Sequence, residues 1–510
     1  MDCTSSKGRF GRQLDSLPSD ISMWWRVFSP NHVTQDVLAQ IYQGSGSEAD
    51  PFMVQWAVKK WLFTLLLSLA TLSVALASSA YIGAVPQIVQ EYRVSSTTAY
   101  LGVSLFVLCF AIGPLLWASI SEIFGRRVVF ITTFGAFTAF NVGAACARDL
   151  VTLFICRCFA GAFGSSSLVH TGGVLADIFP AEERSSAMSA FTASLFFGPT
   201  LGPIIGSFIG MTQGWRWIEG FIAILSGLLW IVGSVVIPET YSPLLLRRRA
   251  QLLSALTKKT YRSKLEDQRT LYSTVVKTAL VRPWLFLFVE PVVLLVSIYL
   301  AIVYGILYLL FAAFPVVYHE RRGWNPGVGT LPFLAVLVGM AIGVLYCVIH
   351  DKLNSRRCLK GADCDSNMEQ RLQPAIVGAI AIPIGLFMFA WTNSPSIHFI
   401  AGSIATAFFG FGLVNIFISM SNYLVDTYTV FAASSLAACS VLRSILGAGF
   451  PLFTPRMYDI LGIHWASSFP AFLSLLCIPI PFLLQRYGPR LRSKCKYMRK
   501  ARDAAANLRS

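Results

Sequence analysis

Residues 285–315 read LFLFVEPVVLLVSIYLAIVYGILYLLFAAFP, and Glu290 is the one charged residue in this stretch. The hydrocarbon core of a bilayer is about 30 Å thick, so a helix needs about 20 apolar residues to cross it. The stretch therefore predicts a membrane-spanning helix. Of the 510 residues in the chain, 55% are hydrophobic and 13% are charged, whereas soluble domains carry about 25% charged residues. We therefore expect an integral membrane protein.

Together with this stretch, the sequence contains twelve apolar stretches of similar length, six before residue 240 and six after residue 283. The twelve predicted spans lie near 62–84, 98–118, 128–146, 151–174, 188–210, 217–237, 285–315, 329–349, 374–392, 397–421, 431–453 and 466–485. The predicted fold is an all-α membrane protein with twelve transmembrane helices in two six-helix bundles. The expected parts are a cytoplasmic tail (1–60), the first bundle (61–237), a cytoplasmic central loop (238–283), the second bundle (284–485) and a basic tail (486–510).

Basic residues predict how the chain is oriented in the membrane. Lys and Arg number 41 against 25 Asp and Glu, which gives a net charge of +16. With twelve spans, most of the 41 fall on the side that holds both termini and the central loop. Cytoplasmic loops are enriched in Lys and Arg, so we expect both termini in the cytoplasm. No separate basic domain stands apart from the spans, so nucleic-acid binding is not expected.

The loop after the second span carries a compact charged motif. Residues 113–127 read GPLLWASISEIFGRR, in which Glu122, Gly125, Arg126 and Arg127 form an acid, a turn and a basic pair. Glycine adopts positive φ without strain, and the charged groups can pair with neighbours. The motif predicts a gating loop at the cytoplasmic face, and the alternative is an ordinary basic loop.

The fifth span contains regularly spaced glycines. Residues 198–206 read GPTLGPIIG, so Gly198, Gly202 and Gly206 recur every four residues. This spacing places them on one helix face and lets another backbone approach closely. Pro199 and Pro203 remove helical hydrogen bonds and bend the helix. The segment predicts a closely packed, bent helix at which a transporter would hinge.

Ionisable residues inside apolar spans are costly and are functional candidates. Arg157 lies within the fourth span and Arg443 within the eleventh. The alternative for Arg157 is that its side chain reaches the membrane surface. Glu290 begins the seventh span and Asp426 ends the tenth, and a desolvated carboxylate there could titrate. Arg157, Glu290 and Asp426 are therefore candidates for proton coupling, with a boundary position as the alternative for the acids.

Polar and aromatic residues within the second bundle predict part of a substrate cavity. Tyr304 and Tyr308 are four residues apart and share one helix face. Aromatic rings that carry a hydroxyl bind apolar or cationic solutes, although core packing is the alternative use. Asn422 and Arg443 complete the set of cavity candidates.

The sequence gives no support for an enzyme. The six histidines are isolated, and no HExxH, Gly-x-Ser-x-Gly or phosphate-loop motif occurs. Cys358 and Cys364 share a polar loop but lack two further ligands for a metal. We expect no catalytic residues, no metal and no cofactor. Without an ATP-binding motif, coupling to an ion gradient remains as the energy source.

These residues together resemble the major facilitator superfamily, and within it the fungal twelve-span drug:proton antiporters that export drugs, polyamines and toxins. The resemblance covers roughly residues 50–497. The loop that holds Gly125 is similar to the signature between spans 2 and 3. Ala118 and Ile123 depart from that signature, in which many members have Gly and Arg. The fourth-span segment is similar to a motif whose arginine, here Arg157, is linked with proton transfer.

Two further segments resemble motifs that are typical of exporters. Residues 198–206 resemble the antiporter motif of the fifth span, and residues 238–241 (PETY) resemble the end of span 6 in the fungal exporters. Ala312 stands where many relatives have an acid. The resemblance implies alternating access, in which two bundles rock about a central cavity and inward protons drive solute outward.

The expected function is therefore proton-coupled export of small organic compounds such as drugs, toxins or a secondary metabolite. The expected setting is the plasma membrane, with the vacuolar membrane as the alternative, and the expected form is a monomer with lipid, protons and substrate as its partners. Two other functions stay open: export of polyamines, and a non-transporting sensor of the same fold that uses its tail and central loop for partners.

Overall fold

The membrane-spanning helices were expected from the apolar pattern, and a computed structural model of the chain contains them. It describes residues 51–179, 181–257, 272–358, 370–394, 397–428 and 431–494, in which the regular structure is helical. Eleven helices within these ranges are long and apolar enough to cross a membrane. The last, Ser434–Gly488, comprises two spans, because the backbone leaves helical geometry at Gly462, with φ 71° and ψ 173°. The prediction of an all-α protein with twelve spans is confirmed.

The first bundle contains six spans. Its first span runs through α4 (Pro51–Ala80), η1 (Tyr81–Ala84) and α5 (Val85–Tyr92), so it continues beyond the predicted limit at residue 84. The other five are α6 (Ser96–Phe124), α7 (Arg126–Ala145), α8 (Leu150–Gly164) with α9 (Ser166–Ile178), α10 (Ala181–Gln213) and α11 (Trp215–Val236). The carboxylate of Asp149 accepts the Thr152 N–H at 2.8 Å and caps α8. This bond lowers the pKa of Asp149 below its usual value.

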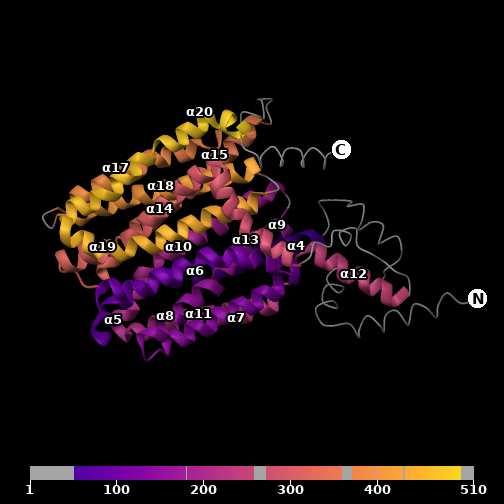
Figure 1. The fold of residues 1–510 in the computed structure, drawn as a ribbon, viewed down its shortest axis with the longest axis horizontal. Coiled ribbons are helices and arrows are strands. Elements are labelled where there is room, and N and C mark those ends of the chain that lie inside the picture. The colour runs from indigo at the N-terminus through magenta and orange to yellow at the C-terminus, as the bar shows by residue number, and fades with distance from the viewer. Residues whose placement is uncertain are drawn as a thin grey trace, which may run out of the picture. The chain divides into compact units, whose positions relative to one another are not determined.

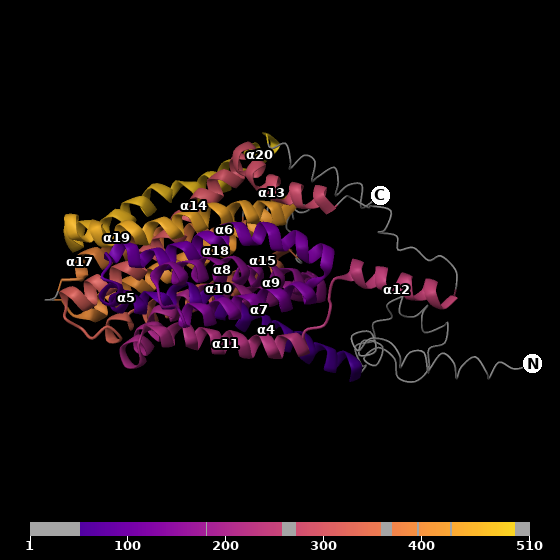
Figure 2. The same cartoon turned by 60° about the horizontal axis from the view of Figure 1, so that its bottom comes forward.

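The central segment is more helical than its polar composition suggests. It contains α12 (Ser242–Thr257) and the first part of α13 (Tyr272–Val289). In both views α12 projects beyond the ends of the spanning helices (Figures 1 and 2).

The second bundle contains the other six spans. They comprise α14 (Pro291–Phe314) with η3 (Pro315–Arg321), η4 (Val328–Thr330) with α15 (Phe333–Cys358), α17 (Gln373–Thr392), α18 (Phe399–Tyr428), and the two spans within α19 (Ala432–Cys477) and α20 (Pro479–Lys494). The segment 285–315, from which the spans were predicted, belongs to the end of α13 and to α14. Almost all side chains of α14 are buried against other helices, which explains why its sequence is apolar on every face.

The helices gather into two groups, which Figure 1 shows in indigo to purple and in orange to yellow. Within the first group α6 packs on α8, and α7 packs on α11. Within the second group α14 packs on α19, and α17 packs on α18. The groups meet mainly through two pairs, α6 with α19 and α10 with α15. Side chains of α6, α10, α15 and α19 that point towards the other bundle therefore lie close to the interface.

Candidate functional site

A buried ion pair lies inside the first bundle. Arg157 of α8 and Glu219 of α11 are 0% and 1% exposed, and Arg157 Nη1 lies 3.4 Å from Glu219 Oε1. Arg157 was predicted to lie inside a span, but Glu219 was not among the predicted site residues. Its sequence signal was an acid near the start of an apolar helix. A buried charge needs a partner of opposite charge, and this pair satisfies that need inside the protein.

Arg157 is also held by backbone carbonyls and aromatic rings. Its guanidinium donates to the carbonyls of Ala77 at 2.9 Å and Gly102 at 3.3 Å. The rings of Tyr81 and Phe106 lie 4.9 and 4.4 Å from its Cζ. Glu219 Oε2 and Arg157 Nη2 have no hydrogen-bond partner. Glu219 therefore keeps an oxygen that could accept a proton, and Arg157 keeps an N–H group that could donate to a water molecule.

Arg126 of the predicted gating loop lies in a charged cluster, but Glu122 of the same loop is not part of it. Arg126 donates to Ser121 Oγ at 2.6 Å and lies 3.4 Å from Asp177 Oδ2. Its guanidinium also lies over the ring of Tyr241, 5.2 Å from the centroid. Burial raises the pKa of Tyr241 above its usual value, so the phenol stays neutral. The exposed carboxylate of Glu122 has no hydrogen bond or ion pair to a described residue.

Glu239 connects this loop to the end of α11. Its carboxylate accepts the backbone N–H groups of Arg126 at 2.9 Å and Arg127 at 3.2 Å, at the first turn of α7. Arg127 also donates to the Ser234 carbonyl at 3.1 Å. Gly125 has φ 99°, and a Cβ at this position would collide with Glu239. A glycine is needed here because the carboxylate occupies the space of a side chain. Residues 238–241 carry part of the resemblance to the fungal exporters, but no role was predicted for Glu239.

The glycines of the fifth span lie against the first span. A Cβ added to Gly198 would lie 2.6 Å from the Ala75 Cβ, and one added to Gly206 would collide with the Ala80 carbonyl. Gly202 faces Ser79 in the same way. The three glycines thus allow α10 to contact the backbone of α4 and η1 directly.

A hydrogen bond between these two spans replaces one that proline removes. Pro203 has no N–H, so the carbonyl of Pro199, four residues earlier, lacks its helical donor. Ser79 Oγ in α4 donates to this carbonyl at 2.7 Å. An unsatisfied carbonyl is costly in a membrane, so Ser79 stabilises the bend in α10.

Tyr304, Tyr308 and Arg443 come together at the interface between the bundles. The hydroxyl of Tyr304 donates to that of Tyr308 at 3.4 Å, and the Tyr308 hydroxyl lies 2.7 Å from Ser78 Oγ of the first bundle. The guanidinium of Arg443 lies 4.8 Å from the ring centroid of Tyr304 and 5.1 Å from that of Phe417. These three predicted cavity residues therefore form one cluster, which we call the tyrosine–arginine cluster.

The remaining candidates lie apart from this cluster. Glu290 precedes α14, is fully buried and accepts the Tyr428 hydroxyl at 2.9 Å. Asp426, near the end of α18, pairs with Arg371 at 2.6 Å and is 26% exposed. Asn422 is half-buried on α18. The structure therefore does not join Glu290 and Asp426 into one proton site.

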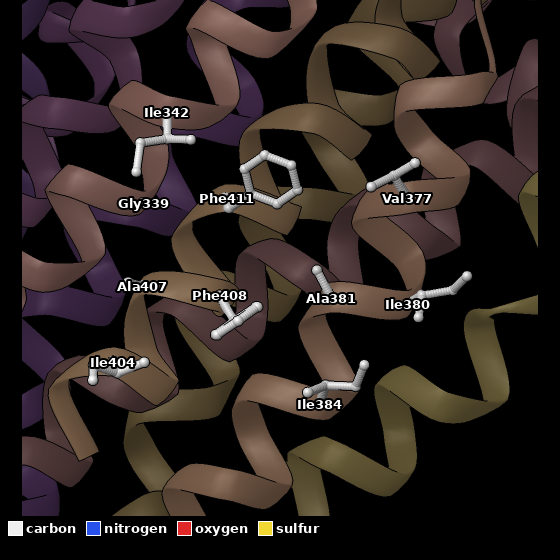
Figure 3. A pocket seen from close by; sticks show the side chains of 10 residues that line it. All are labelled: Gly339, Ile342, Val377, Ile380, Ala381, Ile384, Ile404, Ala407, Phe408 and Phe411. Atoms are coloured by element: carbon white, nitrogen blue, oxygen red, sulfur yellow. The ribbon is translucent and has the colours of Figure 1, made fainter. Parts of the chain in front are cut away.

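A groove of about 520 Å³ lies between α15, α17 and α18 (Figure 3). Its lining is apolar and includes Ile342, Ile380 and Ile384, each of which is about half-exposed. Exposed apolar side chains on spanning helices face lipid. We therefore assign this groove to the lipid-facing surface and not to the transport path.

The family model of the Major Facilitator Superfamily matches residues 67–451. The chain belongs to this superfamily, and it is a multi-pass membrane transporter of small molecules and not an enzyme. The MFS-type efflux pump MFS2 of Trichophyton rubrum is 53% identical, over 94% of this chain and 83% of its own length. The multidrug transporter mdrA of Aspergillus fumigatus is 52% identical, over 95% of this chain and 82% of its own length.

A solved structure supports the fold. The proton:xylose symporter XylE, bound to 6-bromo-6-deoxy-D-glucose, matches with a TM-score of 0.61. The match covers 84% of this chain and 96% of that chain at 16% identity. At this identity the likeness concerns the fold alone.

Proposed function

We propose that the protein exports small organic compounds across the plasma membrane in exchange for protons, by alternating access, as a monomer with both termini in the cytoplasm. The buried pair of Arg157 and Glu219 is the observation that carries this proposal. Ion pairs at full burial inside a membrane are functional by default. The efflux and multidrug names of the relatives support the direction of transport.

The position of the pair suits a proton that enters from outside. Arg157 lies midway along α8, in the first third of the span that α8 and α9 form, and Glu219 lies in the second turn of α11. In the proposed orientation both helices begin at the outer face. A proton that binds Glu219 would neutralise the carboxylate and free Arg157 from its counter-charge. Glu219 thus joins Arg157 as a candidate for proton coupling.

The other features of the first bundle fit a moving protein. The cluster of Arg126, Asp177 and Glu239 holds the cytoplasmic ends of α7, α9 and α11 together, and its release would open that face. The glycine contacts between α10 and α4 give a rigid pair of helices that moves as a unit. Inward movement of protons would then drive the bundles between outward and inward states.

The proposal is tested in cells loaded with a fluorescent drug. Cells that express the protein should retain less drug than cells without it, and a protonophore should remove the difference. Arg157→Ala should abolish extrusion while the protein stays in the membrane. Extrusion that continues undiminished after the protonophore, or that never exceeds that of cells without the protein, would overturn the proposal.

Polyamine export is the second candidate, and the tyrosine–arginine cluster speaks against it. A polycation bound at this cluster would be repelled by the charge of Arg443, and no acid of a described residue pairs with Arg443 to offset that repulsion. Spermine tolerance measures this directly: a deletion strain that tolerates spermine like the wild type would exclude polyamine export. A non-transporting sensor is separated by reconstitution, because a sensor would bind a solute without moving it across a vesicle.

A further inference from the structure

Arg157 and Arg443 are both buried within spanning helices, and they differ in how their charge is balanced. Arg157 lies 3.4 Å from Glu219. Arg443 is only 6% exposed, yet no carboxylate of a described residue lies within ion-pair distance of it. Its Nε is buried without a hydrogen-bond partner. Arg443 therefore carries a charge that the described part of the chain leaves without a counter-ion.

The surroundings of Arg443 compensate this charge only in part. The ring centroids of Tyr304 and Phe417 lie 4.8 and 5.1 Å from its Cζ, and such cation–π contacts offset only part of the cost of desolvating a guanidinium. Removing an ion from water has a penalty of several kcal/mol even after relaxation. The two rings therefore do not replace an anion.

The cluster lies where the two bundles meet. Tyr304 and Arg443 belong to α14 and α19, whereas Ser78 of α4 reaches the Tyr308 hydroxyl across the interface. Phe417 contacts Phe196 of α10, with ring centroids 4.6 Å apart. Rocking of the bundles would open this layer, so a solute could reach Arg443 from the interface.

We propose that Arg443 is the recognition site for an acidic substrate, so that the exported compounds include organic anions with an apolar aromatic or aliphatic body. A carboxylate would accept hydrogen bonds from the guanidinium, for which the arginine geometry is suited. The hydroxyl of Tyr304 adds a second donor, because its bond to Tyr308 is long at 3.4 Å. The faces of Tyr304 and Phe417 would contact the apolar body. This inference rests on the proposed export function and specifies its substrate class.

The test compares three probes of similar shape and different charge: 1-naphthoate, 1-naphthamide and 1-naphthylmethylammonium. Binding to the purified full chain is measured from the shift of the thermal unfolding midpoint with probe concentration. The wild type should bind the carboxylate at least about tenfold more tightly than the amide, the range expected for a hydrogen bond to a charged group. The ammonium probe should bind most weakly.

Variants of Arg443 assign this preference to one side chain. Arg443→Gln should bind the carboxylate and the amide equally, and retained amide binding shows that this variant is folded. Arg443→Lys keeps the charge without the paired donors, so it should keep part of the preference. Arg456→Gln removes an exposed arginine of the same helix, α19, and should behave as the wild type.

Three results would overturn the assignment: no carboxylate binding by the wild type, equal binding of all three probes, or a carboxylate preference that survives in Arg443→Gln. The binding measurement needs no proton gradient. A protein that prefers the carboxylate but moves no solute under a gradient would therefore contradict the export function and leave the anion site standing. Proton-driven transport without a carboxylate preference would support the export function and contradict the anion site.

Discussion

The two intramembrane arginines show how the same residue type acquires different roles from its neighbours. Arg157 is enclosed by Glu219, two backbone carbonyls and two rings, so its charge is balanced inside the first bundle. Arg443 lies between rings at the bundle interface. Both arginines are buried, so their different partners and positions distinguish the proposed proton-coupling residue, Arg157, from the proposed substrate-binding residue, Arg443.

The pair of Arg157 and Glu219 should behave as one unit in mutagenesis. Arg157→Ala leaves an uncompensated buried carboxylate and should destabilise the protein by about 3–5 kcal/mol. The double variant Arg157→Ala with Glu219→Gln removes both charges and should be more stable than the single variant. Thermal unfolding of the detergent-solubilised proteins measures both effects. A double variant that is no more stable than Arg157→Ala would contradict the pairing.

Ser79 should matter more to stability than a serine that bonds only within its own helix. Ser79→Ala leaves the carbonyl of Pro199 without its donor and should destabilise the protein by about 1–3 kcal/mol. Ser73 is equally buried but donates to Ala70 in the same helix. Ser73→Ala is therefore the matched control, with a small effect on the unfolding midpoint. Equal midpoints for the two variants would refute the role of Ser79.

For single residues, the sequence predicted the position along a helix better than the residue's interaction partners. The apolar context of Arg157 predicted that it lies inside a span, because a helix register is local. Its partner Glu219 is distant in sequence and on another helix, so only tertiary packing could reveal it. For the same reason Ser79 and Glu239 were not predicted. Tyr304 and Tyr308 were easier to predict together, because a helix places residues four apart on one face.

Among the elements, α7 depends on a carboxylate from outside its own sequence. Glu239 accepts the N–H groups of Arg126 and Arg127 at the positive end of the helix dipole. Glu239→Ala should therefore destabilise the protein by about 1–3 kcal/mol, and Glu239→Gln, which keeps an acceptor, by less. Asp459→Ala, at an exposed position on α19, serves as the control. A Glu239→Ala protein that unfolds at the wild-type midpoint would show that this cap is dispensable.

The spans could be predicted because their lengths and apolar runs match the membrane. The helical content of residues 238–283 was harder to predict, because α12 is polar and its sequence resembles a loop. The break between the last two spans was predicted to lie between residues 453 and 466, but its position at Gly462 depends on a positive φ that the sequence alone does not specify. The positions of spans are thus local information, whereas turns and caps depend on neighbouring elements.

For the whole molecule, the even number of spans and the distribution of basic residues predict an orientation with both termini in the cytoplasm. The contacts between α6 and α19 and between α10 and α15 define the interface about which two bundles would rock. The Arg157 pair lies inside the first bundle, and the tyrosine–arginine cluster lies between the two. Proton binding and substrate binding would thus occupy different places and be linked by movement of the bundles.

The most direct measurement uses the purified full chain in liposomes with an imposed pH difference. The liposome interior is made acidic, so protons leave as a fluorescent drug enters through transporters of either orientation. We expect drug uptake that rises with the size of the pH difference, disappears with a protonophore and is absent with Arg157→Ala. Uptake by the wild type that is the same with and without the pH difference would contradict proton-coupled export.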